Sequence, residues 1–251
     1  MPRYFVTLAY RGTPYHGWQI QPGVITVQEE LEKAFSTILR TPVAVTGAGR
    51  TDTGVNARQM IAHVDLPEAP ASAEKLVRAL NSLLGPDIAV YSLREVRPDA
   101  HARFDATSRT YHYYAADVKT PFLYPLSWKA PAGLDYDAMN RAARLLLHTE
   151  DFTSFAKLHS DARTNICHVS RAEWLPVADG SGHVFVITAD RFLRNMVRAV
   201  VGTLVDVGRH KLTVDDFQAI IDRRDRCAAG TSMPPQALFL WDVTYPEDIY
   251  I

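Results

Sequence analysis

Apolar residues follow two different spacings along the first part of the chain. They recur at every third or fourth position in two stretches, which predicts helices, and they alternate with polar residues in others, which predicts strands. Thr26 and Glu29 form the pattern of a capping box at the start of the first helix. The predicted elements are a strand over 4–10, a helix over 26–39, strands over 43–45 and 61–66, a helix over 72–84 and a strand over 88–96.

The rest of the chain repeats the order of strand, helix, strand, strand, helix and strand, with one further helix. The predicted elements are a strand over 109–117, a helix over 135–147, strands over 167–177 and 183–189, helices over 193–207 and 214–222, and a strand over 238–245. This order is typical of the split βαβ, or ferredoxin-like, arrangement. We therefore predict an α+β fold of two βαββαβ halves, residues 1–108 and 109–251. Side by side they would build one sheet with helices on one face and a central cleft on the other.

Composition and charge narrow the class of protein. The 251 residues are 47% hydrophobic and carry a net charge of −1, which is typical of a soluble globular protein. No apolar run is long enough to span a bilayer, so we predict a cytoplasmic protein without membrane contact. Cys167 and Cys227 are far apart, and the histidines show no ligand spacing, so we predict no metal. Any nucleic-acid surface must be a local patch.

The stretch from Gly47 to Met60 stands out between two predicted strands. Its three glycines favour a tight loop, and Arg50 and Asp52 stand two residues apart at its centre. A phosphate-binding loop fits poorly, because Asp52 stands where a glycine would be needed and a carboxylate repels phosphate. The loop therefore presents an acid. A simple Asx turn, in which Asp52 caps its own backbone, is the alternative interpretation.

Asp52 is the leading candidate for chemistry. An ordinary aspartate is ionised at pH 7 and is available as a nucleophile or a base. Either role needs a cationic partner, and the candidates are Arg50 in the loop and Arg191, Arg194 and Arg198. The last three are spaced along one edge of the predicted helix 193–207. A solvated helix flank is the alternative for these arginines.

The predicted strand over 109–117 is rich in aromatic residues. Tyr111 and Tyr113 would share one face of the strand, and His112 and Tyr114 the other. Aromatic side chains on an exposed sheet can stack on unpaired bases. Packing in the core or against neighbouring strands is the alternative interpretation.

Seven motifs together resemble the tRNA pseudouridine synthase A family along nearly the whole chain. The most specific is Gly49-Arg50-Thr51-Asp52-Thr53-Gly54-Val55-Asn56-Ala57, which is similar to that family's Gly-Arg-Thr-Asp-x-Gly-Val-His-Ala signature. The supporting motifs occur in the family's order: Tyr10 to Gln21, Thr26 to Gln28, His101 to Phe104, Arg109-x-Tyr111, Phe192 to Arg198 and Pro235 to Leu240.

The resemblance implies the pseudouridine synthase fold, with a mixed, mainly antiparallel sheet built from two related halves. It also implies an isomerase that converts uridine to pseudouridine at positions 38, 39 and 40 of the tRNA anticodon arm. The family works without cofactor or metal, as a homodimer that grips the tRNA across both subunits. The implied partners of this chain are therefore tRNA and a second copy of itself.

The resemblance also assigns roles to individual residues. Asp52 would begin cleavage of the glycosidic bond, and Arg198 would pair with it, which selects one of the three candidate arginines. Arg50 would support base flipping, and Tyr111 would stack on the target base and serve as a candidate for a later proton transfer. Leu238 would form an apolar wall of the pocket.

Further basic residues are candidates for contacts with tRNA phosphates. The candidates are Arg58, Arg78, Arg163, Arg209 and Lys211, and ordinary solvation is the alternative for each. Three positions depart from the family's motifs: Asn56 replaces a usual histidine, Arg11 a usual aspartate and Ala237 a usual glycine. All three lie outside the implied catalytic set.

Two other functions compete with the synthase. A non-catalytic RNA-binding protein on the same duplicated sheet would bind tRNA without product, but neither Asp52 nor Tyr111 is degraded. A nucleoside hydrolase using Asp52 would release free base, and it is weakened because no second well-placed carboxylate is seen to act as general acid.

Overall fold

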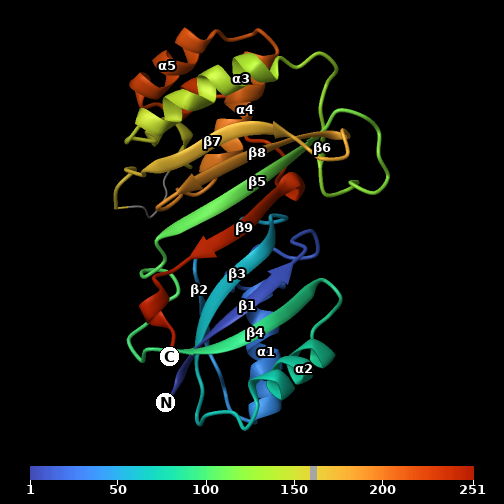
Figure 1. Ribbon diagram of the computed structural model, residues 1–251, viewed down its shortest axis with the longest axis vertical. Coiled ribbons are helices and arrows are strands. Elements are labelled where there is room, and N and C mark those ends of the chain that lie inside the picture. Colours follow the sequence, from blue (N-terminus) through green and yellow to red (C-terminus); the bar gives the residue numbers. More distant parts are fainter. Residues whose placement is uncertain (159–162) are drawn as a thin grey trace. The chain divides into compact units, whose positions relative to one another are not determined.

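The chain forms two compact units in a computed structural model that describes residues 1–158 and 163–251 (Figure 1). Unit 1 contains Met1–Thr107 and Leu240–Ile251, and unit 2 contains Ser108–Phe239. Unit 1 thus combines the two ends of the chain, and unit 2 is the stretch of sequence between them. Within the described ranges, no helix is long and apolar enough to cross a membrane.

Unit 1 is a mainly antiparallel sheet with two helices. Its elements are β1 (Arg3–Tyr10), α1 (Val27–Leu39), β2 (Val45–Gly47), β3 (Asn56–Asp65), α2 (Ala73–Leu83), β4 (Ile88–Val96) and the part of β9 (Leu238–Thr244) from residue 240 onward. The strands follow the order β4-β1-β3-β9, and β2 also pairs with β3. Strand β1 is antiparallel to both β3 and β4, so Val6 lies opposite Ala62 on one side and Leu93 on the other.

The helices of unit 1 form where the sequence predicts them. Thr26 caps α1 by accepting a hydrogen bond from the Glu29 backbone N–H (3.4 Å), whereas the Glu29 carboxylate pairs with Lys33 (2.9 Å). The apolar face of α1 is fully buried at Leu31 and Phe35. Helix α2 packs on β4 and beside α1 (Figure 1), so the two helices cover the sheet together.

Unit 2 has the same kinds of element in a similar order. They are β5 (Ser108–Ala116), β6 (Trp128–Lys129), α3 (Tyr136–Ala143), β7 (Val169–Pro176), β8 (Gly182–Ala189), α4 (Met196–Gly208) and α5 (Val214–Arg223), with short 3-10 helices at Arg144–His148, Thr153–Phe155, Arg226–Ala228 and Pro235–Ala237. Strand β8 lies between β5 and β7 and is antiparallel to both, whereas β6 is parallel to β5. Helix α4 is the most buried helix and packs against α3 and α5 (Figure 1).

The predicted α+β fold with a mixed, mainly antiparallel sheet is confirmed, but some boundaries differ. Strand β3 begins at Asn56, within the predicted loop, because Ala57 pairs with Tyr10 and extends the ladder. The predicted helix over 135–147 ends its α-helical part at Ala143 and continues as a 3-10 helix. Strand β6 was not predicted, since its two residues are too short for any periodicity.

The start of α4 requires a further correction. The prediction began this helix at Leu193, but it begins at Met196. Asn195 adopts a left-handed conformation (φ 65°), and its side-chain Nδ2 donates a hydrogen bond to Ser232 Oγ (2.6 Å). Arg191 and Arg194 therefore precede the helix, and the prediction that both share a helix edge with Arg198 is wrong.

Candidate active site

Asp52 lies in the loop between β2 and β3. Its backbone carbonyl accepts a hydrogen bond from the Val55 N–H (3.1 Å), which closes a four-residue turn. Gly54, the third residue of that turn, has φ +78°, a conformation that glycine adopts without steric cost. Asp52 is half-buried and Arg50 is exposed. The turn thus places the carboxylate at the margin between the protein interior and solvent.

The residue before Asp52 is held from two sides. The Thr51 hydroxyl lies 2.8 Å from the hydroxyl of Tyr10, at the end of β1, and both side chains are buried. The Thr51 carbonyl accepts a hydrogen bond from the Trp18 backbone N–H (3.2 Å). Both bonds hold the residue before Asp52, so they restrict the backbone position from which the Asp52 side chain projects.

Two glycines let the first loop of the chain approach the Asp52 loop. A methyl group on Gly12 would lie 2.0 Å from the Val55 carbonyl oxygen, and one on Gly17 would lie 2.5 Å from the Thr51 carbonyl oxygen. Any side chain at either position would force the two loops apart. We call residues 10–18 together with residues 48–56 the clasp. The sequence motif from Tyr10 to Gln21 did not reveal this role.

Asn56 completes the clasp. Its side chain is buried, and Oδ1 accepts a hydrogen bond from the Gly12 N–H (2.9 Å). The departure from the family's usual histidine is thus a structural position that ties the two loops together. Of the other departures, Arg11 also belongs to the clasp but forms an ion pair with Asp87 outside it (2.7 Å), and Ala237 is buried in a 3-10 helix of unit 2.

Tyr111 lies on β5 in unit 2 and is half-buried. Its ring meets the ring of Phe192 edge to face, with the centroids 5.0 Å apart. The segment that carries Phe192 is tied to β5 by a second contact, because Arg109 Nη1 donates to the Asp190 carbonyl (2.7 Å). Phe192 therefore positions the Tyr111 ring, a role that the motif Phe192 to Arg198 did not reveal.

Arg198 occupies the first turn of α4 and is held by the segment that precedes Pro234. Its Nε donates a hydrogen bond to the Met233 carbonyl, and the Met233 N–H donates to the Arg198 carbonyl (3.1 Å). The Nε bond uses one of the five N–H donors of the guanidinium and fixes the plane of the group. Leu238 follows a few residues later at the start of β9 and is buried.

The other residues of β5 have different environments. Tyr113 is completely buried, and its hydroxyl has no hydrogen-bond partner within residues 1–158 and 163–251. Burial raises the pKa of Tyr113, and the nearby Arg198 charge offsets only part of this rise. Burial, assisted by the Arg171 charge, lowers the pKa of His112 to about 4. Tyr113 is thus a neutral core residue, whereas Tyr111 keeps an accessible face.

The five residues implied as the site belong to both units. Unit 1 carries Arg50 and Asp52 on one loop, and unit 2 carries Tyr111, Arg198 and Leu238. Within unit 2, the segment that anchors Arg198 runs on into the strand that begins at Leu238.

The candidate phosphate contacts all have exposed side chains. They are Arg58, Arg78, Arg163, Arg209 and Lys211. The Arg58 guanidinium lies 5.8 Å from the ring centroid of Tyr91, and Lys211 lies 3.7 Å from the Asp206 carboxylate. Exposure satisfies the first requirement for a phosphate contact.

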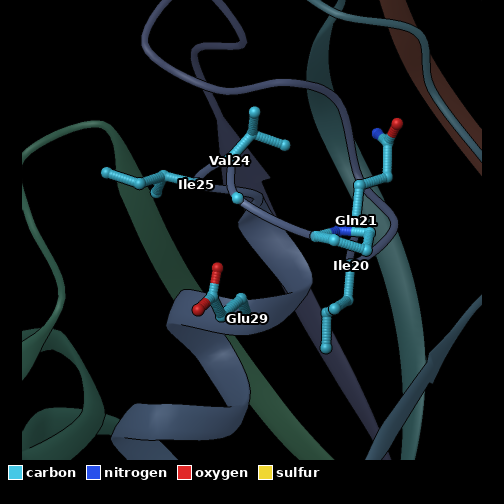
Figure 2. A pocket seen from close by; sticks show the side chains of 7 residues that line it. Ile20, Gln21, Val24, Ile25 and Glu29 are labelled. Carbon is cyan, nitrogen blue, oxygen red and sulfur yellow. The ribbon is translucent and has the colours of Figure 1, made fainter.

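One pocket lies in unit 1, near the start of α1. Figure 2 shows the pocket, which is formed by the turn over residues 20–25 and by Glu29 in α1; Ile20, Val24 and Ile25 point away from one another. It contains none of the implied site residues. Among the described residues, no three His, Cys, Asp or Glu side chains gather closely enough to hold a metal ion.

Known proteins resemble this chain over its whole length. The family model described as tRNA pseudouridine synthase matches residues 142–246. A protein of Bacteroides thetaiotaomicron is 57% identical over 251 residues, which cover 100% of this chain and 93% of the relative. One of Parabacteroides distasonis is 54% identical over 250 residues, covering 100% and 98%. One of Exiguobacterium sibiricum is 37% identical over 249 residues, covering 98% of each.

All three relatives carry the name tRNA pseudouridine synthase A. The matched ranges cover 100% of this chain in the first two relatives, so they span both units. The enzymes of this family are isomerases that act on tRNA uridine without a cofactor. By its sequence and its fold, the chain belongs to the tRNA pseudouridine synthase A family.

Proposed function

We propose that this enzyme isomerises uridine at positions 38, 39 and 40 of the tRNA anticodon arm, as a homodimer that grips the tRNA across both subunits. The observation that carries the proposal is the clasp, which holds Asp52 at the head of a closed turn with bonds to Tyr10 and Trp18 on the preceding residue. A reaction that needs one carboxylate in a defined place needs such support.

The chemistry requires no external reagent. The bond between uracil N1 and ribose C1′ breaks, a bond between uracil C5 and C1′ forms, and the C5 proton is lost while N1 gains a proton. Atoms and electrons balance within the nucleotide, so neither a redox cofactor nor a metal is needed. Asp52 begins the reaction either by attack at the sugar or by removing a proton from it, and each route uses the ionised carboxylate.

The remaining residues act around Asp52. Arg198 pairs with the carboxylate, and the Nε bond to Met233 supports this role by fixing the guanidinium plane. Tyr111 stacks on the flipped uracil and is a candidate for the later proton transfer, with its ring steadied by Phe192. Arg50 supports the flipped nucleotide from the same loop as Asp52. Leu238 forms an apolar wall.

Asp52→Asn is the decisive variant. We expect turnover to fall by on the order of 1,000-fold or more while tRNA affinity is retained, because the amide keeps the shape but is neither a nucleophile nor a base. The measurement is tritium release from tRNA carrying 5-tritiated uridine, with Asp215→Asn, on the exposed first turn of α5, as the matched control. Normal release by Asp52→Asn would end the proposal. Mapping the product in single-site tRNA substrates tests the three positions.

In the proposed complex, tRNA phosphates are contacted by Arg58, Arg78, Arg163, Arg209 and Lys211. Each such contact releases condensed counterions, so log Kd should change linearly with log salt concentration. We expect Arg58→Ala and Arg209→Ala each to reduce that slope by about one and to leave kcat unchanged. A wild-type affinity that ignored ionic strength would contradict the assignment.

A further inference from the structure

The turn between β4 and β5, residues 100–105, is held by side chains from three other parts of unit 1. Its backbone polar groups are bonded one after another. From outside the turn, Arg3 Nη1 donates to the Ala100 carbonyl (2.9 Å) and the Tyr245 hydroxyl donates to the Ala102 carbonyl. The Ala102 N–H in turn donates to His63 Nδ1 (3.1 Å). Within the turn, the His101 N–H donates to Asp105 Oδ2 (2.7 Å) and the Asp105 N–H donates to the His101 carbonyl (3.0 Å). Such a turn is pre-ordered before any ligand arrives.

Two histidine rings support the tip of this turn. His63 meets His101 edge to face with centroids 4.6 Å apart, and His101 lies against Phe104 at 4.2 Å. His101 Nδ1 also accepts from the backbone N–H groups of Arg103 (3.1 Å) and Phe104 (3.3 Å). Burial lowers the pKa of both histidines, that of His63 to about 4. A lowered pKa favours the neutral imidazole, the form in which Nδ1 can accept these hydrogen bonds.

The residue presented by this framework is an exposed phenylalanine. Phe104 is 73% exposed, although its own backbone N–H is bonded to His101 and the residues before it are held as described above. The exposed Arg103 places its guanidinium 5.8 Å from the centroid of the same ring. Single exposed apolar residues on loops are common, but this one combines a rigid support, an aromatic face and an adjacent cation. Those three properties match the requirements for stacking an unpaired base beside a phosphate.

We propose that Phe104 is a stacking platform for an unpaired base of the bound tRNA and that Arg103 contacts a neighbouring phosphate. The proposal rests on the proposed function only for the identity of the ligand. His63, which supports the platform, lies seven residues along β3 from Asn56 of the clasp, which corresponds to roughly 23 Å of strand. The stacked base is therefore not the target uridine. Phe104 binds substrate at a distance from the chemistry.

The test measures tRNA affinity and single-turnover rate for three variants. Phe104→Ala should weaken binding roughly 5- to 100-fold and leave the single-turnover rate at saturating enzyme unchanged, because only a base contact is lost. Phe104→Trp should bind at least as well as the wild type. Phe122→Ala removes another exposed phenylalanine (94%) from a loop of unit 2 and serves as the matched control, with wild-type affinity expected.

A direct readout uses the indole introduced by Phe104→Trp. Stacking on a base should quench its emission on titration with tRNA, beyond the change shown by Phe122→Trp. Wild-type affinity in Phe104→Ala would overturn the proposal. So would conversion of Phe104→Ala to a lower oligomeric state in light scattering, since the ring would then be a contact between two copies of the chain. Affinity is measured in the Asp52→Asn background as well, so failure of the platform and failure of the proposed chemistry give different results.

Discussion

The loop that carries Asp52 and the segment that carries Arg198 hold their functional side chains by different means. Each holds a functional side chain by means of a stretch of chain distant in the sequence. In unit 1 the support comes from close backbone approach at Gly12 and Gly17 and from neutral hydrogen bonds to Thr51. In unit 2 it comes from a bond made by the arginine itself, to the Met233 carbonyl.

The difference reflects the side chains that are held. A carboxylate is short, so its position is determined by the backbone from which it projects, and the clasp fixes that backbone. An arginine is long and has many rotamers, so fixing its backbone alone would leave the guanidinium free to move. The Nε bond orients the group at its far end instead. Substitutions should therefore damage the clasp through its backbone and the Arg198 site through its side chain.

The largest effect is expected from Gly12→Ala. The added methyl group would meet the Val55 carbonyl at 2.0 Å, so the two loops of the clasp must separate. We expect a loss of about 3 kcal/mol in the free energy of unfolding and a fall in turnover of roughly 100-fold or more. Denaturant titration and tritium release provide the two measurements.

Gly85→Ala is the matched control, because a methyl group there has nothing within 4 Å. It should change neither quantity. If Gly12→Ala were as active as the wild type, the clasp would not be what positions Asp52.

A smaller effect is expected from Arg198→Lys. Lysine keeps the charge but lacks the planar fork and the Nε donor, so the bond to Met233 is lost and the cation is no longer oriented. We expect kcat to fall roughly 10- to 100-fold with little change in tRNA affinity. Arg194→Lys, at an exposed position before α4, should stay within about threefold of the wild type. Equal losses of kcat in the two variants would show that the orientation of the Arg198 guanidinium does not determine the rate.

The smallest effect is expected from Tyr10→Phe. Removing one neutral hydrogen bond to Thr51 should cost about 1 kcal/mol and lower turnover less than tenfold, because the Trp18 bond and the glycine contacts remain. Thr51→Val removes the same bond from the other side. A double-mutant cycle should give a coupling energy near that of the single bond, and additive effects would show that the two hydroxyls do not interact functionally.

Much of the secondary structure could be predicted because its signals are local. Helix α1 begins after the predicted cap at Thr26, and β4 spans the predicted residues 88–96. The boundaries that depend on contacts with other segments of the chain were predicted wrongly. Strand β3 extends back to Asn56 because β1 is there to pair with it, and α4 starts late because Asn195 bonds to Ser232.

The candidate site was predicted in the same uneven way. The sequence motifs single out Asp52, Tyr111 and Arg198, and the roles of these residues remain proposals. The motifs do not reveal which residues support these three. Thr51, Asn56 and Phe192 have that role because segments distant in the sequence fold against them. A buried asparagine and an ordinary threonine carry no local signal of such a role.

The sequence by itself determined the family, the α+β order of elements and the presence of an acidic glycine-rich loop. These properties follow from periodicity, capping residues and short motifs, which involve only neighbours along the chain. The tertiary structure decided how Asp52 is held, which tyrosine of β5 enters the core and where Phe104 is presented. Each of these depends on contacts between residues more than thirty positions apart, and such contacts form only when the whole unit closes around its core.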